Sequence, residues 1–187
     1  MESPIFIVGA NRSGTTLLRL ILNAHSRIAI PDELTYLGSY VAGVSIEKWR
    51  APDLSRTAYE ALVDDFLGRN RTVLDGLDLE ALKRDLCAGP VNFRRPYQGA
   101  LEAWARHHGK ERWGEKTPGN LFYADVLLDM FPEAQVLYLV RDPRAGVASM
   151  QDVSFFPEDV VFNSRSRRKP NVQGRARLMR NVPGTQR

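Results

Sequence analysis

Short apolar runs alternate along this chain with longer amphipathic segments. Residues 4–9 and 134–140 are apolar enough to predict two buried strands, and residues 112–116 predict a shorter third one. Between the strands, apolar side chains recur at helical spacing. We expect helices over residues 13–25, 55–69, 77–89, 97–109, 120–131 and 143–151. Strands that alternate with helices are typical of an α/β fold, here a parallel sheet flanked by helices.

The segments between the first and third strands carry further expectations. In the first helix, the buried side is expected to come from the apolar residues Leu17, Leu18, Leu20, Ile21 and Leu22. Residues 28–40 are expected to be irregular, with a helix beginning at Asp32. The helices between residues 55 and 109 form a helical insertion, which we expect to shape the substrate side of the fold.

Length and composition fit a soluble globular protein with one core. The 187 residues suit one domain, and no apolar run is long enough to span a bilayer. A secretory signal is not expected, and a single cysteine, Cys87, rules out an internal disulfide, so a cytoplasmic location is expected. The three histidines show no ligand spacing, and no metal site is expected.

The net charge of +4 arises from one end of the chain. Residues 164–187 contain eight of the 26 lysines and arginines and none of the 22 acidic residues, which leaves 18 basic residues in the remainder. We therefore expect a globular domain over residues 1–163 and a basic, disordered tail over 164–187. Binding of nucleic acid or another polyanion by the tail is the less favoured interpretation.

The stretch FIVGANRSGTTLLRLIL, residues 6–22, has the pattern of a phosphate-binding loop between a strand and a helix. Gly9, Gly14 and Thr16 occupy the usual positions, but Thr15 stands where a nucleotide hydrolase has its lysine. Such a loop still presents backbone N–H groups and a helix N-terminus to an anion, and Arg12 supplies a cation. The missing lysine argues against hydrolysis of ATP or GTP.

A second block, FPEAQVLYLVRDPRAGVASM at residues 131–150, follows in the expected order. Together the two blocks resemble the sulfotransferase family, in its tyrosylprotein-sulfotransferase-like and bacterial branches. The family uses 3′-phosphoadenosine 5′-phosphosulfate (PAPS) as donor. The resemblance implies that the 3′-phosphate is bound by Arg141 and Ser149. It implies that the 5′-phosphosulfate is bound by the loop residues Arg12, Ser13, Gly14, Thr15 and Thr16.

The resemblance also implies two catalytic residues. Glu33 falls where the family places the base that deprotonates the acceptor, with Asp32 as a rival. Lys116, in the sequence WGEKTP, matches a lysine that neutralises the bridging oxygen of the donor. The ordinary alternatives are a helix cap at Asp32 and a solvated Lys116 paired with Glu115.

Three functions are carried forward. The favoured one is a PAPS-dependent sulfotransferase that acts on a hydroxyl or amine of a small molecule or peptide. The alternatives are a phosphate-loop kinase, and a non-catalytic nucleotide-binding remnant with a polyanion-binding tail. The family continues beyond the second block with elements that are not found here. We therefore expect an incomplete sheet, an apolar patch near residues 136–140 and 147–151, self-association and weak activity.

Overall fold

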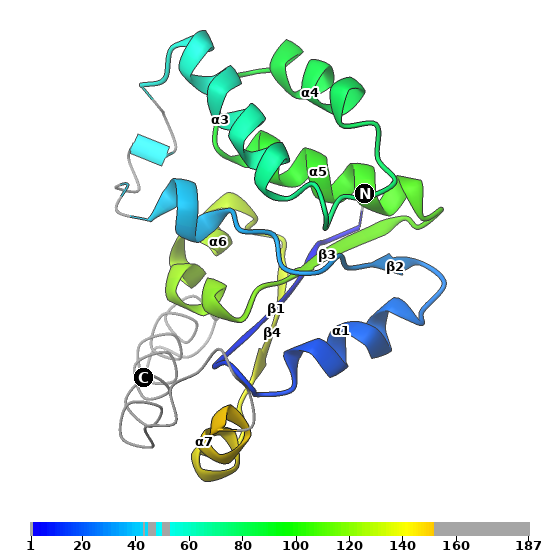
Figure 1. Cartoon of the computed structure of the whole chain (residues 1–187), viewed down its shortest axis with the longest axis vertical. Coiled ribbons are helices and arrows are strands. Elements are labelled where there is room, and N and C mark those ends of the chain that lie inside the picture. Colours follow the sequence, from blue (N-terminus) through cyan, green and yellow to red (C-terminus); the bar gives the residue numbers. More distant parts are fainter. Residues whose placement is uncertain (1, 43, 45–47, 50–52, 152–187) are drawn as a thin grey trace.

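Four parallel strands form the single sheet of the computed structural model, which describes residues 2–42, 44, 48–49 and 53–151 (Figure 1). The strands lie in the order β2-β3-β1-β4. Their bounds are β1 Ile5–Gly9, β2 Ile28–Ala29, β3 Arg112–Lys116 and β4 Gln135–Leu139. The predicted parallel α/β fold is confirmed, whereas the boundary at residue 163 and the tail over 164–187 lie outside the described residues.

Strand β2 corrects the expectation that residues 28–40 are irregular. It is two residues long and pairs with Arg112 and Trp113 of β3. A strand this short has no alternation that a sequence pattern could reveal. No helix begins at Asp32 either, and the next helical element is one turn of π-helix, η1, at Leu37–Val41.

The helices otherwise follow the predicted segments closely. They are α1 Thr15–Asn23, α3 Arg56–Arg69, α4 Leu79–Ala88, α5 Arg94–His107, α6 Ala124–Met130 and α7 Pro143–Gln151. A 3₁₀-helix, η2 Pro118–Tyr123, precedes α6, so the segment predicted as one helix over 120–131 is divided in two. Helices α3 and α4 begin where Ser55 and Asp78 accept hydrogen bonds from backbone N–H groups of their first turns. Among the described residues, no helix is both long and apolar enough to cross a membrane.

The two faces of the sheet are covered unequally (Figure 1). Side chains alternate along a strand, so Phe6 of β1 and Glu115 of β3 point to one face, and Ile7 and Lys116 point to the other. The first face carries the larger core, built with side chains of α3, α4, α5 and α6. The second face carries a smaller cluster of four isoleucines under α1.

Helix α1 buries a narrower stripe than its sequence predicts. Leu18 and Leu22, four positions apart, pack against the small isoleucine cluster. Leu17, Leu20 and Ile21 are instead exposed, at 64%, 54% and 59%. A helix that lies on a sheet can bury only the side that faces the sheet, so the remaining apolar side chains would need a second surface to be covered.

The carboxyl ends of β1, β3 and β4 meet at one edge of the sheet, and the three segments that leave them form the site. The end of β1 lies tightly against the end of β4, since a Cβ atom on Gly9 would come within 2.7 Å of the Leu139 carbonyl oxygen. Glycine at this position therefore allows the close approach of the two segments. This edge is also where parallel α/β sheets bind their ligands.

Candidate active site

The loop between β1 and α1 has the backbone geometry of an anion-binding site. Arg12 and Gly14 both adopt left-handed conformations, with φ of 63° and 97°. The N–H of Ser13 closes the turn by donating to the Ala10 carbonyl at 3.2 Å. Alternating left-handed residues turn successive N–H groups to one side, and here they lead into the N-terminus of α1 at Thr15. The first turn of α1 contains no acidic residue, so its positive dipole end remains available to an anion.

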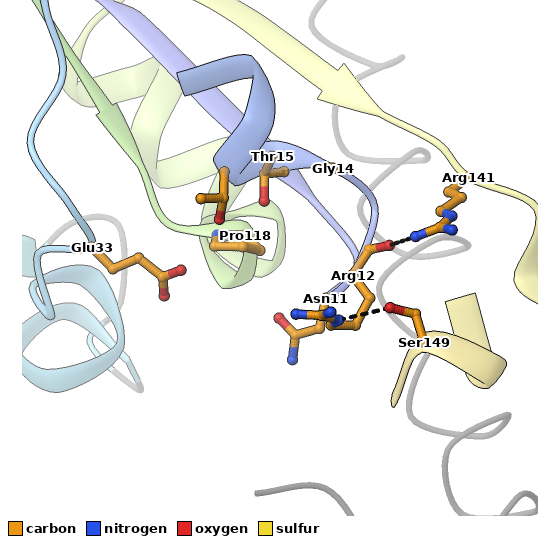
Figure 2. A pocket seen from close by; sticks show the side chains of 9 residues that line it. Asn11, Arg12, Gly14, Thr15, Glu33, Pro118, Arg141 and Ser149 are labelled. Carbon is orange, nitrogen blue, oxygen red and sulfur yellow. Dashed lines mark hydrogen bonds between the residues drawn. The ribbon is translucent and has the colours of Figure 1, made fainter. Parts of the chain in front are cut away.

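A cavity of about 630 Å³ lies against this loop (Figure 2). Its lining residues are Asn11, Arg12, Gly14, Thr15, Thr16, Glu33, Pro118, Arg141 and Ser149. The cavity therefore contains six of the seven residues expected to bind the donor, together with the expected base. Its volume lies in the usual range for a site that holds a nucleotide-sized ligand.

Ser13 is the expected donor ligand that does not line the cavity. Its hydroxyl is buried and has no hydrogen-bond partner among the described residues. Its N–H is used within the turn. Ser13 therefore contributes to the turn through its backbone.

Direct hydrogen bonds join the two sequence blocks. Arg12 Nε donates to Ser149 Oγ at 3.0 Å, and Arg141 Nη1 donates to the Arg12 carbonyl oxygen at 3.1 Å (Figure 2). Arg141 follows β4 and Ser149 lies on α7, so both reach the loop from the neighbouring edge of the sheet. Because Arg141 binds the carbonyl of the left-handed residue, it also stabilises the loop conformation.

The expected base and the expected catalytic lysine are in contact. Lys116 Nζ lies 2.6 Å from Glu33 Oε1 and 3.1 Å from Asp32 Oδ1. The lysine is 1% exposed, and the two carboxylates are far more open to solvent. A buried ammonium group is costly unless it is paired, and two carboxylates supply that pairing here. Lys116 does not line the cavity, whereas its partner Glu33 does.

Contacts at both ends hold the segment that carries these carboxylates. The Asn23 side chain at the end of α1 makes two hydrogen bonds with the backbone of Ile30. Further along, the N–H of Thr35 donates to Asn70 Oδ1 at 3.1 Å. The segment is therefore fixed against α1 on one side and against the end of α3 on the other.

Asp32 and Glu33 have different surroundings. Partial burial opposes ionisation of Asp32, but the hydrogen bond and charge of Lys116, the N–H of Glu33 and the charge of Arg19 together hold its pKa below the usual value. Arg19 Nη2 lies 3.7 Å from Asp32 Oδ2. A carboxylate held in this way is a poorer proton acceptor, and Asp32 is not among the residues that line the cavity. Of the two, only Glu33 points into the cavity (Figure 2).

Sequence reasoning missed several residues of the site. Asn11 and Pro118 line the cavity, and Arg19 supports Asp32. The signal for Arg19 was its position as the one charged residue among the apolar residues of α1. The alternative of a solvated Lys116 paired with Glu115 is wrong, because the two side chains lie on opposite faces of the sheet and both are buried.

Comparison with known proteins agrees with this geometry. A family model described as "Sulfotransferase family" matches residues 4–179. Protein-tyrosine sulfotransferase 2 of Gallus gallus is 31% identical over 147 residues, which cover 78% of this chain and 33% of the relative. Nodulation protein NoeE of Sinorhizobium fredii is 27% identical over 150 residues, which cover 78% of this chain and 30% of the relative. The chain thus spans about a third of the length of these curated relatives.

The fold has a counterpart among solved structures. The sulfotransferase domain from the curacin biosynthetic pathway superposes with a TM-score of 0.54 at 23% identity, over 98% of this chain and 64% of that one. This likeness concerns the fold, and the match to the family model covers most of the chain. The resemblance carried by the two sequence blocks is thereby confirmed, and the chain belongs to the sulfotransferase family.

Proposed function

We propose that this chain binds PAPS and transfers its sulfuryl group to a hydroxyl or amine acceptor. The main support for the proposal is the set of residues that line one cavity. The loop, Arg141 and Ser149 line one side of it, and Glu33 lies opposite them (Figure 2). A site for sulfuryl transfer needs this combination of anion-binding groups and a base.

In this proposal, the donor is held by groups of two kinds. The N–H groups of the loop, the hydroxyls of Thr15 and Thr16 and the guanidinium of Arg12 bind the 5′-phosphosulfate. Arg141 and Ser149 bind the 3′-phosphate, for which a planar guanidinium is well suited. No metal ion is invoked, because these groups supply the positive charge.

The reaction is proposed to be an in-line displacement at sulfur. Glu33 takes the proton of the acceptor hydroxyl while the acceptor oxygen forms its bond to sulfur. The bond between sulfur and the bridging oxygen of the donor breaks, and its electron pair stays on the leaving phosphate. Lys116 neutralises the charge that develops there.

The contact between Glu33 and Lys116 couples these two events. Glu33 holds the Lys116 ammonium at 2.6 Å while the carboxylate is charged. Once Glu33 has taken the proton, most of that attraction is lost. The ammonium, which Asp32 still holds at 3.1 Å, can then turn towards the leaving oxygen at the stage of the reaction when the negative charge develops.

The acceptor and the location of the protein are also matters of proposal. One of the relatives described above is named protein-tyrosine sulfotransferase 2, which favours a hydroxyl on a peptide or a small molecule. The single cysteine suits a reducing compartment, and we place the protein in the cytoplasm.

A calorimetric titration of the purified chain tests donor binding. Adenosine 3′,5′-bisphosphate, the product left by PAPS, is expected to bind and to raise the melting temperature, because it binds only the folded state. AMP lacks the 3′-phosphate and is the matched control, for which much weaker binding is expected. Binding of magnesium–ATP without binding of the bisphosphate would favour the kinase alternative and reject the proposal.

A further inference from the structure

Glu115 is a buried carboxyl group for which the proposed reaction has no use. It is 0% exposed and lies one residue before Lys116 on β3. Its side chain enters the larger core beside Phe6, whereas that of Lys116 enters the opposite face beside Ile7. One strand end therefore carries a buried carboxyl group and a buried ammonium group on its two faces.

Three side chains hold the Glu115 carboxyl group. The hydroxyl of Thr117 donates to Oε1, and Asn120 Nδ2 of η2 donates to Oε2 at 2.8 Å. The hydroxyl of Tyr97 on α5 makes a further hydrogen bond, and Asn120 Nδ2 also lies 3.1 Å from that hydroxyl. Burial raises the pKa of Glu115 to about 7 in spite of these bonds, and the charge of Glu33 adds to the rise.

The same network reaches the segment that carries Glu33. The Thr117 hydroxyl lies 3.4 Å from the carbonyl oxygen of Leu34, and the ring of Tyr97 stacks on Tyr36 at 4.8 Å. Leu34 directly follows Glu33. Glu115 is therefore adjacent in sequence to the catalytic lysine and is linked through one hydroxyl to the residue after the catalytic base.

Thr117 has a single hydroxyl proton for two acceptors. When Glu115 is ionised, this proton goes to the carboxylate, and the Leu34 carbonyl receives none from Thr117. When Glu115 is protonated, the carboxyl group can donate to Thr117, whose own proton is then free for Leu34. The network thus holds the two chain segments in either state, through a different pattern of hydrogen bonds.

We propose that Glu115 is a positioning residue, which acts through Thr117 and the end of β3 to fix Lys116 against Glu33. The importance of that contact rests on the proposed function. Lys116 is buried, so its side chain has little freedom to change conformation. The position of its ammonium group therefore follows the position of the strand end. A displacement of about 1 Å would be enough to lose the short contact with Glu33.

A general structural role is the competing explanation, and a double-mutant cycle separates the two. Affinity for adenosine 3′,5′-bisphosphate is measured for Glu115→Ala, Glu115→Gln and Thr117→Val, each with Lys116 intact and with Lys116→Met. Valine preserves the volume of threonine, so Thr117→Val tests the link even where Glu115→Ala unfolds. Thr72→Val changes an exposed threonine and is the matched control.

Glu115→Ala and Thr117→Val are expected to weaken binding at least fivefold with Lys116 intact and less than twofold with Lys116→Met. Glu115→Gln is expected to stay within twofold of the wild type, since its amide group donates to Thr117 and accepts from Asn120. Equal losses in both backgrounds, or no loss in either, would overturn the proposal.

A second measurement needs no ligand, so it remains decisive if the bisphosphate fails to bind and the proposed function is wrong. Amide hydrogen exchange at Thr35 and Tyr36 is expected to become at least tenfold faster in Thr117→Val, with exchange at Leu18 of α1 unchanged. Unchanged exchange at Thr35 and Tyr36 would show that Glu115 and Thr117 do not hold this segment.

Discussion

The contact between Lys116 and Glu33 concentrates the proposed chemistry in two side chains. A free lysine in the loop would be solvated, whereas Lys116 is buried and pairs with Glu33 and Asp32. In the proposal, the charge that nucleotide hydrolases supply from the loop is supplied from β3, the neighbouring strand of the sheet. This proposed role of Lys116 would explain why the loop needs no lysine of its own.

Glu33→Gln is expected to separate catalysis from binding. Glutamine has nearly the same shape but cannot accept the proton, so turnover of PAPS with a phenol as acceptor should fall by about 10²–10⁴. Affinity for adenosine 3′,5′-bisphosphate should change only a few-fold. Asp32→Asn is the matched control, with a smaller loss of turnover because Asp32 does not line the cavity. The reverse order of the two variants would transfer the role of base to Asp32.

The pKa of Glu115 makes a prediction about stability. Its folded-state pKa of about 7 lies above the usual 4.5, so the folded protein binds this proton more tightly than the unfolded chain does. Wild-type stability should therefore decline as the pH rises from about 4.5 through about 7. Glu115→Gln has no such proton, and its unfolding free energy relative to wild type should rise over this window by up to about 3 kcal/mol. Urea unfolding of both proteins at pH 5, 6, 7 and 8 measures this difference. A difference in unfolding free energy that does not change with pH would contradict the prediction.

Among the elements, the loop after β1 depends on groups far away in the sequence. Arg12 has a left-handed backbone, which is unfavourable for a residue with a side chain, and Arg141 holds its carbonyl in that conformation. Arg141 therefore has two roles in the proposal: it stabilises the loop and it binds phosphate.

Arg141→Ala is accordingly expected to weaken binding of adenosine 3′,5′-bisphosphate. Loss of one charge-assisted hydrogen bond costs on the order of 1.5–3 kcal/mol, which corresponds to roughly 10- to 100-fold in affinity. Arg144→Ala is the matched control, because Arg144 is exposed, pairs with Asp142 and does not line the cavity. Calorimetry should show nearly wild-type affinity for the control, and equal losses in the two variants would point to a non-specific effect of charge.

An element could be predicted from the sequence when a local pattern of residues determines it. Strands β1, β3 and β4 and most of the helices are local patterns, and the sequence predicted them. Strand β2 is too short to show a pattern. The helix expected at Asp32 was wrong because Leu34 and Tyr36 are drawn into the core instead.

The site likewise contains residues that a local motif predicts and residues that only the fold brings together. The phosphate loop is a contiguous motif, so its residues could be named in advance. The contact of Glu33 with Lys116 joins residues 83 positions apart, and the Glu115 network joins three separate elements. Neither follows from spacing alone, because each depends on which strands become neighbours and which face each side chain takes.

For the whole molecule, the exposed apolar surface differs from the one expected. Val140 after β4 is 68% exposed, as predicted, but Val147 and Met150 of α7 are buried. The larger exposed group lies on α1, at Leu17, Leu20 and Ile21. Strand β4 lies at the edge of the sheet and pairs only with β1 among the described strands. Exposed apolar side chains and an open strand edge both favour association.

The purified chain is therefore expected to self-associate at micromolar concentrations. Leu20→Gln combined with Ile21→Gln should reduce association in sedimentation velocity without lowering the melting temperature, because both side chains are exposed. Glutamine adds no charge near the donor site. Leu18→Gln, which faces the isoleucine cluster, should lower the melting temperature instead. Unchanged association in the double variant would exclude α1 as the surface through which the protein self-associates.

The bonds that join Arg12 to Ser149 and Arg141 to the Arg12 carbonyl have a thermodynamic consequence. These groups already satisfy one another, so an entering phosphate must take over bonds that the protein makes with itself. Binding is then an exchange of partners, and the net gain is smaller than the sum of the new contacts. When the spent nucleotide departs, the protein recovers its own bonds, and this lowers the cost of release. We therefore expect this arrangement to favour release of the product nucleotide.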